Sequence, residues 1–106
     1  MAQFDVHRNP GRYAESAPFV VVVQSSQFDD YRRRVVVPLV RASEMGKITY
    51  PAFNPTFSVN GIAVALDPLD MVAVPLERLG PSVESLAEHG QAIVTALDEL
   101  FSRAWK

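Results

Sequence analysis

The chain has 106 residues, of which 48% are hydrophobic and 21% charged, with a net charge of −2. This length suits a single domain over residues 1–106, and no apolar run approaches the roughly 20 residues of a membrane-spanning helix. The absence of cysteine excludes disulfides and thiolate chemistry. Lys and Arg are scattered apart from residues 32–34, which disfavours direct nucleic-acid binding. No signal segment is visible at the start, so we expect a cytoplasmic protein with no membrane contact.

Residues 3–39 predict three strands. Phe4 and Val6 alternate with polar neighbours, which is typical of a short first strand. Asn9-Pro10-Gly11 supplies turn chemistry, so we expect an exposed loop over residues 8–17. Two valine-rich runs follow at 19–23 and 35–39, and β-branched residues of this kind pack well on a sheet. We expect the two runs to form a hairpin in the core.

The middle of the chain predicts further strands. Residues 41–46 are too short for a well-supported helix, and we interpret residues 47–50, ahead of Pro51, as an edge strand. Asn60-Gly61 is the clearest turn signal, because a type I′ turn needs positive φ at both central residues. Apolar alternation at 57–59 and 62–64 then predicts a tight hairpin. We expect another strand at 71–74, which ends at a proline that cannot donate a ladder hydrogen bond.

The last quarter of the chain predicts one amphipathic helix. From Val83 to Ala104, apolar residues recur at three- and four-residue steps. Ser85 and Glu88 have the spacing of a capping box, which indicates where the helix begins. Gly90 falls on the apolar face, and we interpret it as a point where another backbone comes close.

No group of residues predicts catalysis, and we expect no cofactor and no metal. His7 and His89 match no metal-ligand spacing, so we interpret both as structural or solvated. We expect the carboxylate pairs 29/30, 67/70 and 84/88 to be solvated, and no nucleophile-elbow or phosphate-loop pattern is present. The basic run 32–34 is interpreted as a solvated strand end, with contact to phosphate or an acidic partner as the alternative.

Phe101 and Trp105 place two large aromatic residues within the last six positions. One interpretation is that Phe101 docks on the sheet and Trp105 covers an edge of the core. The other is an anchor for a partner protein, because aromatic residues dominate the energetics of interfaces.

Several segments in collinear order resemble the CcdB family of bacterial toxins. They are Gln3-Phe4-x-Val6, residues 18–25, residues 33–39, Tyr50-Pro51, residues 71–75 and the ending Ile93-x-x-Ala96-x-x-x-x-Phe101. The resemblance implies a mainly β fold with one C-terminal α-helix, in which an antiparallel SH3-like barrel stays partly open, as in CcdB and MazF. It also implies a two-fold homodimer.

The resemblance further implies a toxin that is not an enzyme. Such a toxin binds the A subunit of DNA gyrase, traps the gyrase–DNA cleavage complex, and is neutralised by a CcdA-like antitoxin with a disordered C-terminal segment. Ser25 matches the serine of the family's Gln-Ser pair near the target surface, and Phe101 matches the residue before the toxic tail.

The family's best-known member continues from that position with Trp-Gly-Ile, where this chain has Ser102-Arg103-Ala104 followed by Trp105-Lys106. The candidate gyrase-binding residues are therefore Ser25, Phe101, Ser102, Arg103, Ala104 and Trp105. Two alternatives stay open: a MazF-like endoribonuclease, against which the acidic net charge argues, and a CcdB homologue that has no gyrase activity and binds only antitoxin.

Overall fold

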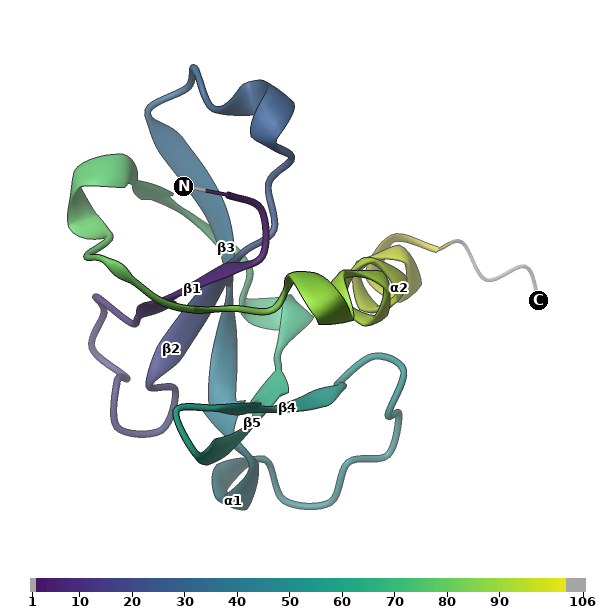
Figure 1. Cartoon of the computed structure of the whole chain (residues 1–106). Coiled ribbons are helices and arrows are strands. Elements are labelled where there is room, and N and C mark those ends of the chain that lie inside the picture. The colour runs from purple at the N-terminus through teal and green to yellow at the C-terminus, as the bar shows by residue number, and fades with distance from the viewer. Residues whose placement is uncertain (1, 103–106) are drawn as a thin grey trace.

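The structure is a computed structural model that describes residues 2–102, and it forms a mostly β protein whose sheet curls into a half-barrel beside a C-terminal helix (Figure 1). The sheet is antiparallel, with strand order β4-β5-β3-β2-β1-β7 and with β6 pairing β3. The strands are β1 (Asp5–Arg8), β2 (Phe19–Val22), β3 (Arg33–Arg41), β4 (Thr56–Val59), β5 (Ile62–Leu66), β6 (Val72–Pro75) and β7 (Ser82–Ser85). The helices are α1 (Ala42–Met45) and α2 (Gly90–Phe101), with short 3₁₀ turns η1 (Ser26–Phe28), η2 (Pro68–Asp70), η3 (Leu76–Arg78) and η4 (Ala87–His89).

The long strand β3 organises the sheet because it pairs with three other strands. Residues 36–39 pair with β2, while residues 33–36 pair with β6 and residues 39–41 pair with β5. Since β2 overlaps both of the other partners along β3, β6 and β5 must share the opposite edge, one after the other. The sheet therefore divides into two arms along that edge of β3.

The strands β2 and β3 are buried on both faces of the sheet. All four residues of β2 are buried, and their side chains alternate between two clusters. The main core lies on the face that α2 covers and contains Val6, Phe19, Val21, Val37, Leu39, Phe57, Val59, Val64, Leu66, Leu86, Ile93 and Ala96. A smaller core lies on the other face and contains Val20, Val22, Val36 and Leu79, with Val74 packed against it.

The two predicted hairpins are confirmed. The valine-rich runs form β2 and β3, which pair in antiparallel fashion, and the segments around Asn60-Gly61 form β4 and β5. Asn60 has φ 50° and Gly61 has φ 77°, as a turn with two left-handed central residues requires.

The segment 47–50 was predicted as an edge strand, and this prediction is wrong. The chain turns there instead, because the carbonyl of Tyr50 accepts hydrogen bonds from the amides of Phe53 and Asn54. Just before it, residues 42–45 form the single turn α1. Phe4 was predicted to lie in the first strand, but it has φ 71° and lies outside β1, which instead includes Arg8 from the predicted loop.

The helix begins later than the capping box at Ser85 and Glu88 predicted, because α2 begins at Gly90. Residues 82–85 form β7, which covers the free edge of β1. Ser85 Oγ accepts from the amide of Ala87 at 3.2 Å rather than from Glu88, so no capping box forms. Leu86 lies directly after β7 and is buried although it precedes α2, which explains why the apolar spacing continues across the boundary.

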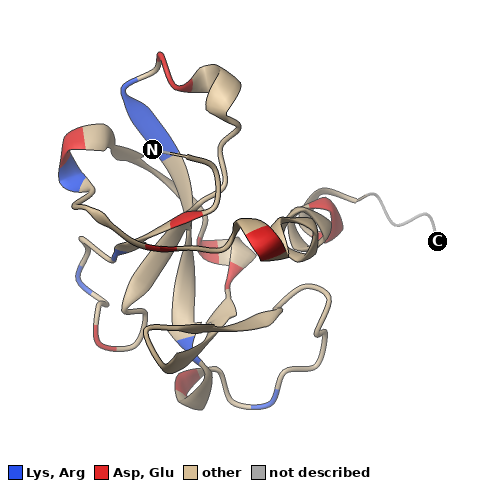
Figure 2. Cartoon of the chain, in the orientation of Figure 1, with Lys and Arg blue, Asp and Glu red and all other residues tan. Residues whose placement is uncertain are grey.

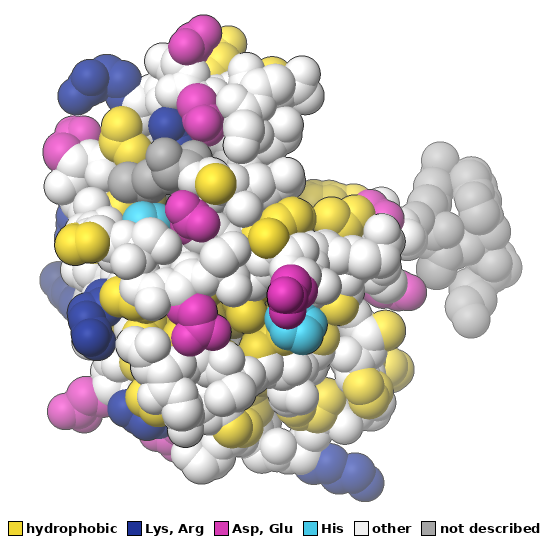
Figure 3. All heavy atoms as spheres, viewed as in Figure 1, with side chains coloured by type: hydrophobic (Ala, Val, Ile, Leu, Met, Phe, Trp, Pro, Cys, Tyr) yellow, Lys and Arg dark blue, Asp and Glu magenta, His cyan; other side chains and the backbone are white. Residues whose placement is uncertain are grey.

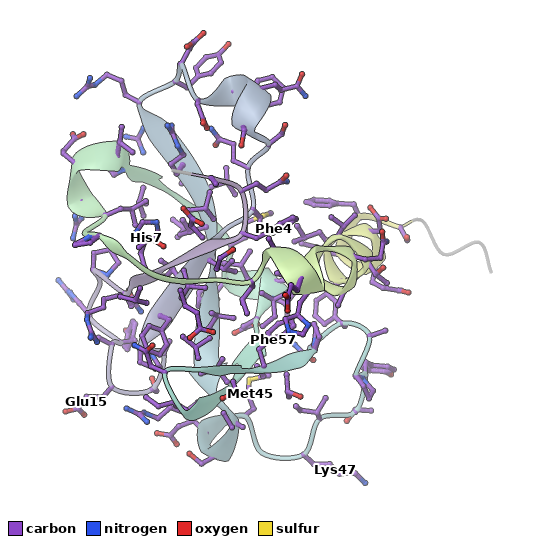
Figure 4. The ribbon with its side chains drawn as sticks, viewed as in Figure 1. Phe4, His7, Glu15, Met45, Lys47 and Phe57 are labelled. Carbon is purple, nitrogen blue, oxygen red and sulfur yellow. The ribbon has the colours of Figure 1, made fainter. Side chains whose placement is uncertain are left out.

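Gly90 makes a close approach as predicted, but its neighbour is a side chain and not a backbone. A Cβ at this position would lie 2.6 Å from Cε2 of Phe4. Figure 4 shows Phe4 directed towards the start of α2, on the opposite side of β1 from His7. The ring of Phe4 packs against the main core, so it has little room to move away. This contact sets how closely α2 approaches the sheet.

Replacing Gly90 with Ala should destabilise the protein by about 1–2 kcal/mol, because the clash with Phe4 outweighs the helix propensity that alanine gains. Urea unfolding measures the change. Gln91→Ala, at the next and exposed helix position, is the control and should stay within about 0.5 kcal/mol of the parent. The cost of Gly90→Ala should be smaller in a Phe4→Leu background than in the wild-type chain, and an equal cost in both backgrounds would contradict the proposed clash.

Candidate functional site

Ser25 lies at the start of the connection between β2 and β3, where it caps η1. Its Oγ accepts a hydrogen bond from the amide of Gln27 at 3.3 Å. Beside it lies a hollow of about 460 Å³, which we call the aromatic hollow. Its lining residues are Val23, Gln24, Ser25, Phe28, Tyr31 and Val35.

The aromatic hollow has the chemistry of a protein-binding surface. Phe28 is 46% exposed and Tyr31 is 68% exposed, and their ring centroids lie 6.4 Å apart at an angle of 55°. Gln24 braces the base of the hollow: its Nε2 donates to the carbonyls of Phe28 and Arg33, and its Oε1 accepts from the amide of Val35. Exposed aromatic rings beside fixed polar groups are enriched where proteins bind one another.

Phe101 is the last residue of α2, and 70% of its surface is exposed. The interpretation that Phe101 docks on the sheet is therefore wrong. Ser102 follows the helix, and its Oγ donates to the carbonyl of Asp98 at 2.6 Å. Arg103, Ala104 and Trp105 lie outside the described residues.

Ser25 and Phe101 come from different elements, and the structure does not join them in one pocket within this chain. No described residue of α2 lines the aromatic hollow. Figure 3 shows further hydrophobic side chains gathered on the surface around α2. A partner protein that contacted both residues would have to reach across this surface or across two copies of the chain.

The basic run at the start of β3 is only partly solvated, which corrects one expectation. Arg32 and Arg33 are exposed, and Arg32 lies 3.7 Å from the carboxylate of Glu77. Arg34 is buried and 3% exposed. In Figure 2 many charged residues lie in loops and at strand ends, acidic residues also lie on α2, and this basic segment is seen where β3 begins.

The two histidines have structural or solvated positions, as predicted. His7 is buried, and its Nδ1 donates to the carbonyl of Gly80 at 2.7 Å, while Nε2 has no partner. His89 is exposed and lies beside the ring of Phe57, with centroids 5.3 Å apart. Within residues 2–102, no three His, Asp or Glu side chains come close enough together to hold a metal ion.

A second hollow, of about 700 Å³, lies between the loop 9–17, α1 and η2. Asp67 and Asp70 line it together with Tyr13, Met45 and others. Asp67 is partly buried rather than solvated, because it enters η2 beneath this loop. Burial raises the pKa of Asp67 above 3.8, and the hydrogen bond and negative charge of Asp70 raise that pKa further.

The class of protein is a mostly β half-barrel with a C-terminal helix. The model of one protein family, described as CcdB protein, matches residues 3–102, and the chain therefore belongs to the CcdB family. Members of this family are toxins of toxin–antitoxin modules rather than classical enzymes, and they have an antitoxin partner. A search of curated proteins gave no match. No helix within the described residues is long and apolar enough to cross a membrane.

Replacing Asp67 with Asn should stabilise the fold at pH 7. A carboxyl whose pKa is higher in the folded state than 3.8 binds its proton more tightly there, so ionised Asp67 weakens the fold at neutral pH. The wild-type chain regains this stability as the pH falls through the raised pKa of Asp67 towards 3.8, and the advantage of Asp67→Asn disappears below that value.

Urea unfolding at pH 7 and at acid pH measures both stabilities. Asp30→Asn removes the same charge from an exposed position and is the matched control, with little expected change. An Asp67→Asn variant less stable than the wild-type chain at pH 7 would contradict the assignment.

Proposed function

We propose that this chain is the toxin of a type II toxin–antitoxin module and acts in the cytoplasm as a homodimer. The dimer binds the A subunit of DNA gyrase, traps the gyrase–DNA cleavage complex, and is neutralised by a CcdA-like antitoxin. The observation that carries this proposal is the family match over residues 3–102, combined with a large aromatic side chain left exposed at the end of α2.

The exposed Phe101 supports a role in target binding. A ring that is 70% exposed on a stable helix contributes little to folding, whereas burial of such a ring in an interface is worth about 2–4 kcal/mol. Ser25 and the aromatic hollow supply a second contact area, and the residues Ser102, Arg103, Ala104 and Trp105 extend the contact beyond the helix.

Two-fold symmetry supports the choice of a symmetric target. A homodimer built on a two-fold axis presents the end of α2 and the aromatic hollow twice, related by a half-turn about that axis. A target that is itself two-fold symmetric would offer two copies of the matching surface to one toxin dimer.

A DNA-cleavage assay with purified gyrase tests the function. The protein should cause cleaved DNA to accumulate, and an antitoxin encoded beside it should reverse this effect. If no cleaved DNA accumulates while the antitoxin still binds, the chain is an antitoxin-binding homologue without gyrase activity. Degradation of cellular RNA in a parallel incubation would instead favour the endoribonuclease alternative.

Phe101→Ala should weaken binding to the gyrase A subunit by about 2–4 kcal/mol, because it removes the anchor. Tyr13→Ala is the matched control, since Tyr13 is 75% exposed but lies on the 9–17 loop. Isothermal titration measures the affinity, and light scattering checks that each variant keeps the oligomeric state of the parent. Equal losses in both variants would contradict a specific role for Phe101.

A chain that lacks residues 102–106 should fold with wild-type stability, because these residues follow the end of α2. It should also lose toxicity when its expression is induced in bacterial cells. Killing by this truncated chain would remove residues 102–105 from the binding site.

A further inference from the structure

Arg34 is buried beneath the connection between β2 and β3, and its side chain forms hydrogen bonds with the backbone of that connection. Its guanidinium donates to three carbonyl oxygens: Nη1 to Tyr31 at 2.5 Å and to Arg33 at 3.0 Å, and Nη2 to Asp29 at 3.1 Å. These acceptors are spread over residues 29–33 and converge on one side chain. The planar fork of arginine suits this role, because it carries five donors in fixed directions.

The ion pair with Asp29 is the weaker part of this arrangement. Nε of Arg34 lies 3.7 Å from Oδ1 of Asp29, which is too long for a hydrogen bond, and Nε has no other partner. The side chain of Asp29 is 40% exposed, so water screens the pair. The hydrogen bonds to the carbonyls therefore account for most of the stabilisation that Arg34 gives to the connection.

A charged residue at this position is costly for the fold alone. Arg34 pairs with Val74 in the sheet and lies two residues before Val36, so it faces the side of the smaller apolar core. Burial of a charge in such surroundings is unfavourable unless its donors are satisfied, and an apolar residue would pack there without that penalty. An apolar residue could not donate hydrogen bonds to the carbonyls within residues 29–33, and this is the contribution that Arg34 makes.

The residues held by Arg34 form the wall of the aromatic hollow. Tyr31 accepts from Arg34 through its carbonyl and presents its ring to the hollow, and Phe28 stands next to it. Other contacts also fix the connection: the side-chain amide of Gln24 donates to two carbonyls, the amide of Leu76 donates to the carbonyl of Arg32, and Ser25 Oγ accepts from the amide of Gln27. Within the connection, short turns form in which the amides of Phe28, Asp29 and Tyr31 donate to carbonyls three residues earlier. Such turns open easily when they lack a buried partner.

We infer that Arg34 is a positioning residue whose buried guanidinium gathers the carbonyls of residues 29, 31 and 33 and so fixes the shape of the aromatic hollow for its protein target. The identity of that target, the gyrase A subunit, rests on the function proposed above.

The test compares Arg34→Lys with Arg33→Lys. Both substitutions keep the charge, but only the first removes a fork from a buried site, since Arg33 is exposed on the same strand. Hydrogen exchange of the amides of Phe28, Asp29 and Tyr31 reports opening of the connection. In Arg34→Lys these amides should exchange about tenfold to a hundredfold faster, while those of β2 keep their wild-type rates.

Affinity for the gyrase A subunit is measured on the same proteins. Arg34→Lys should bind about tenfold more weakly or worse, and Arg33→Lys should exchange and bind much as the wild type does. Should Arg34→Lys fail to fold, Arg34→Met takes its place, because a flexible thioether packs well beside Val36 and Val74.

Wild-type exchange rates in the Arg34 variant would overturn the inference. Fast exchange with wild-type gyrase affinity would overturn it as well, because the shape of the hollow would then not matter for binding. If the wild-type chain itself does not bind gyrase, the proposed function fails, and the exchange rates alone decide whether Arg34 holds the hollow.

Discussion

The strands β2 and β3 have to be covered on both sides, because the side chains of Phe19 to Val22 are all buried although they alternate across the sheet. Each such side chain contributes about 1.5–3 kcal/mol when it leaves water, so neither face can stay open. The helix α2 and the β4–β5 hairpin supply one cover. Val74 of β6 and Leu79, from the segment between β6 and β7, contribute to the other. The remaining elements are arranged around this requirement.

The two covers differ in chemistry. The larger core on the α2 face is apolar throughout, whereas His7 and Arg34 belong to the opposite face by the alternation of their strands. Polar groups in the smaller core are tied to backbone carbonyls, so they fix particular loops where apolar side chains would only fill space. The connection beside Ser25 is the clearest example, since its shape depends on a buried cation.

Local patterns predicted the parts of the fold that local chemistry decides. Valine runs and Asn60-Gly61 determine strands and a turn almost independently of their surroundings, and both hairpins are confirmed. The start of α2 could not be predicted in this way, because residues 82–85 join β1, which lies far away in the sequence. The burial of Arg34 could not be predicted from the sequence for the same reason. A run of three arginines gives no sign of which one turns inward, because the strand period places Arg33 on a face as apolar as that of Arg34. The exposure of Phe101 depends on where the helix ends against the sheet, which periodicity alone does not give.

The pairing of β1 with β7 links the two ends of the chain, since Asp5 lies opposite Ser85 and the amide of Leu86 donates to the carbonyl of Phe4. During synthesis the outer edge of β1 therefore stays open until residues 82–86 have left the ribosome, and the site for α2 is completed only after that. Long-range pairing of this kind delays folding to the end of translation. Under the function proposed above, the contact that the end of α2 makes with its target therefore cannot form while the chain is still being made.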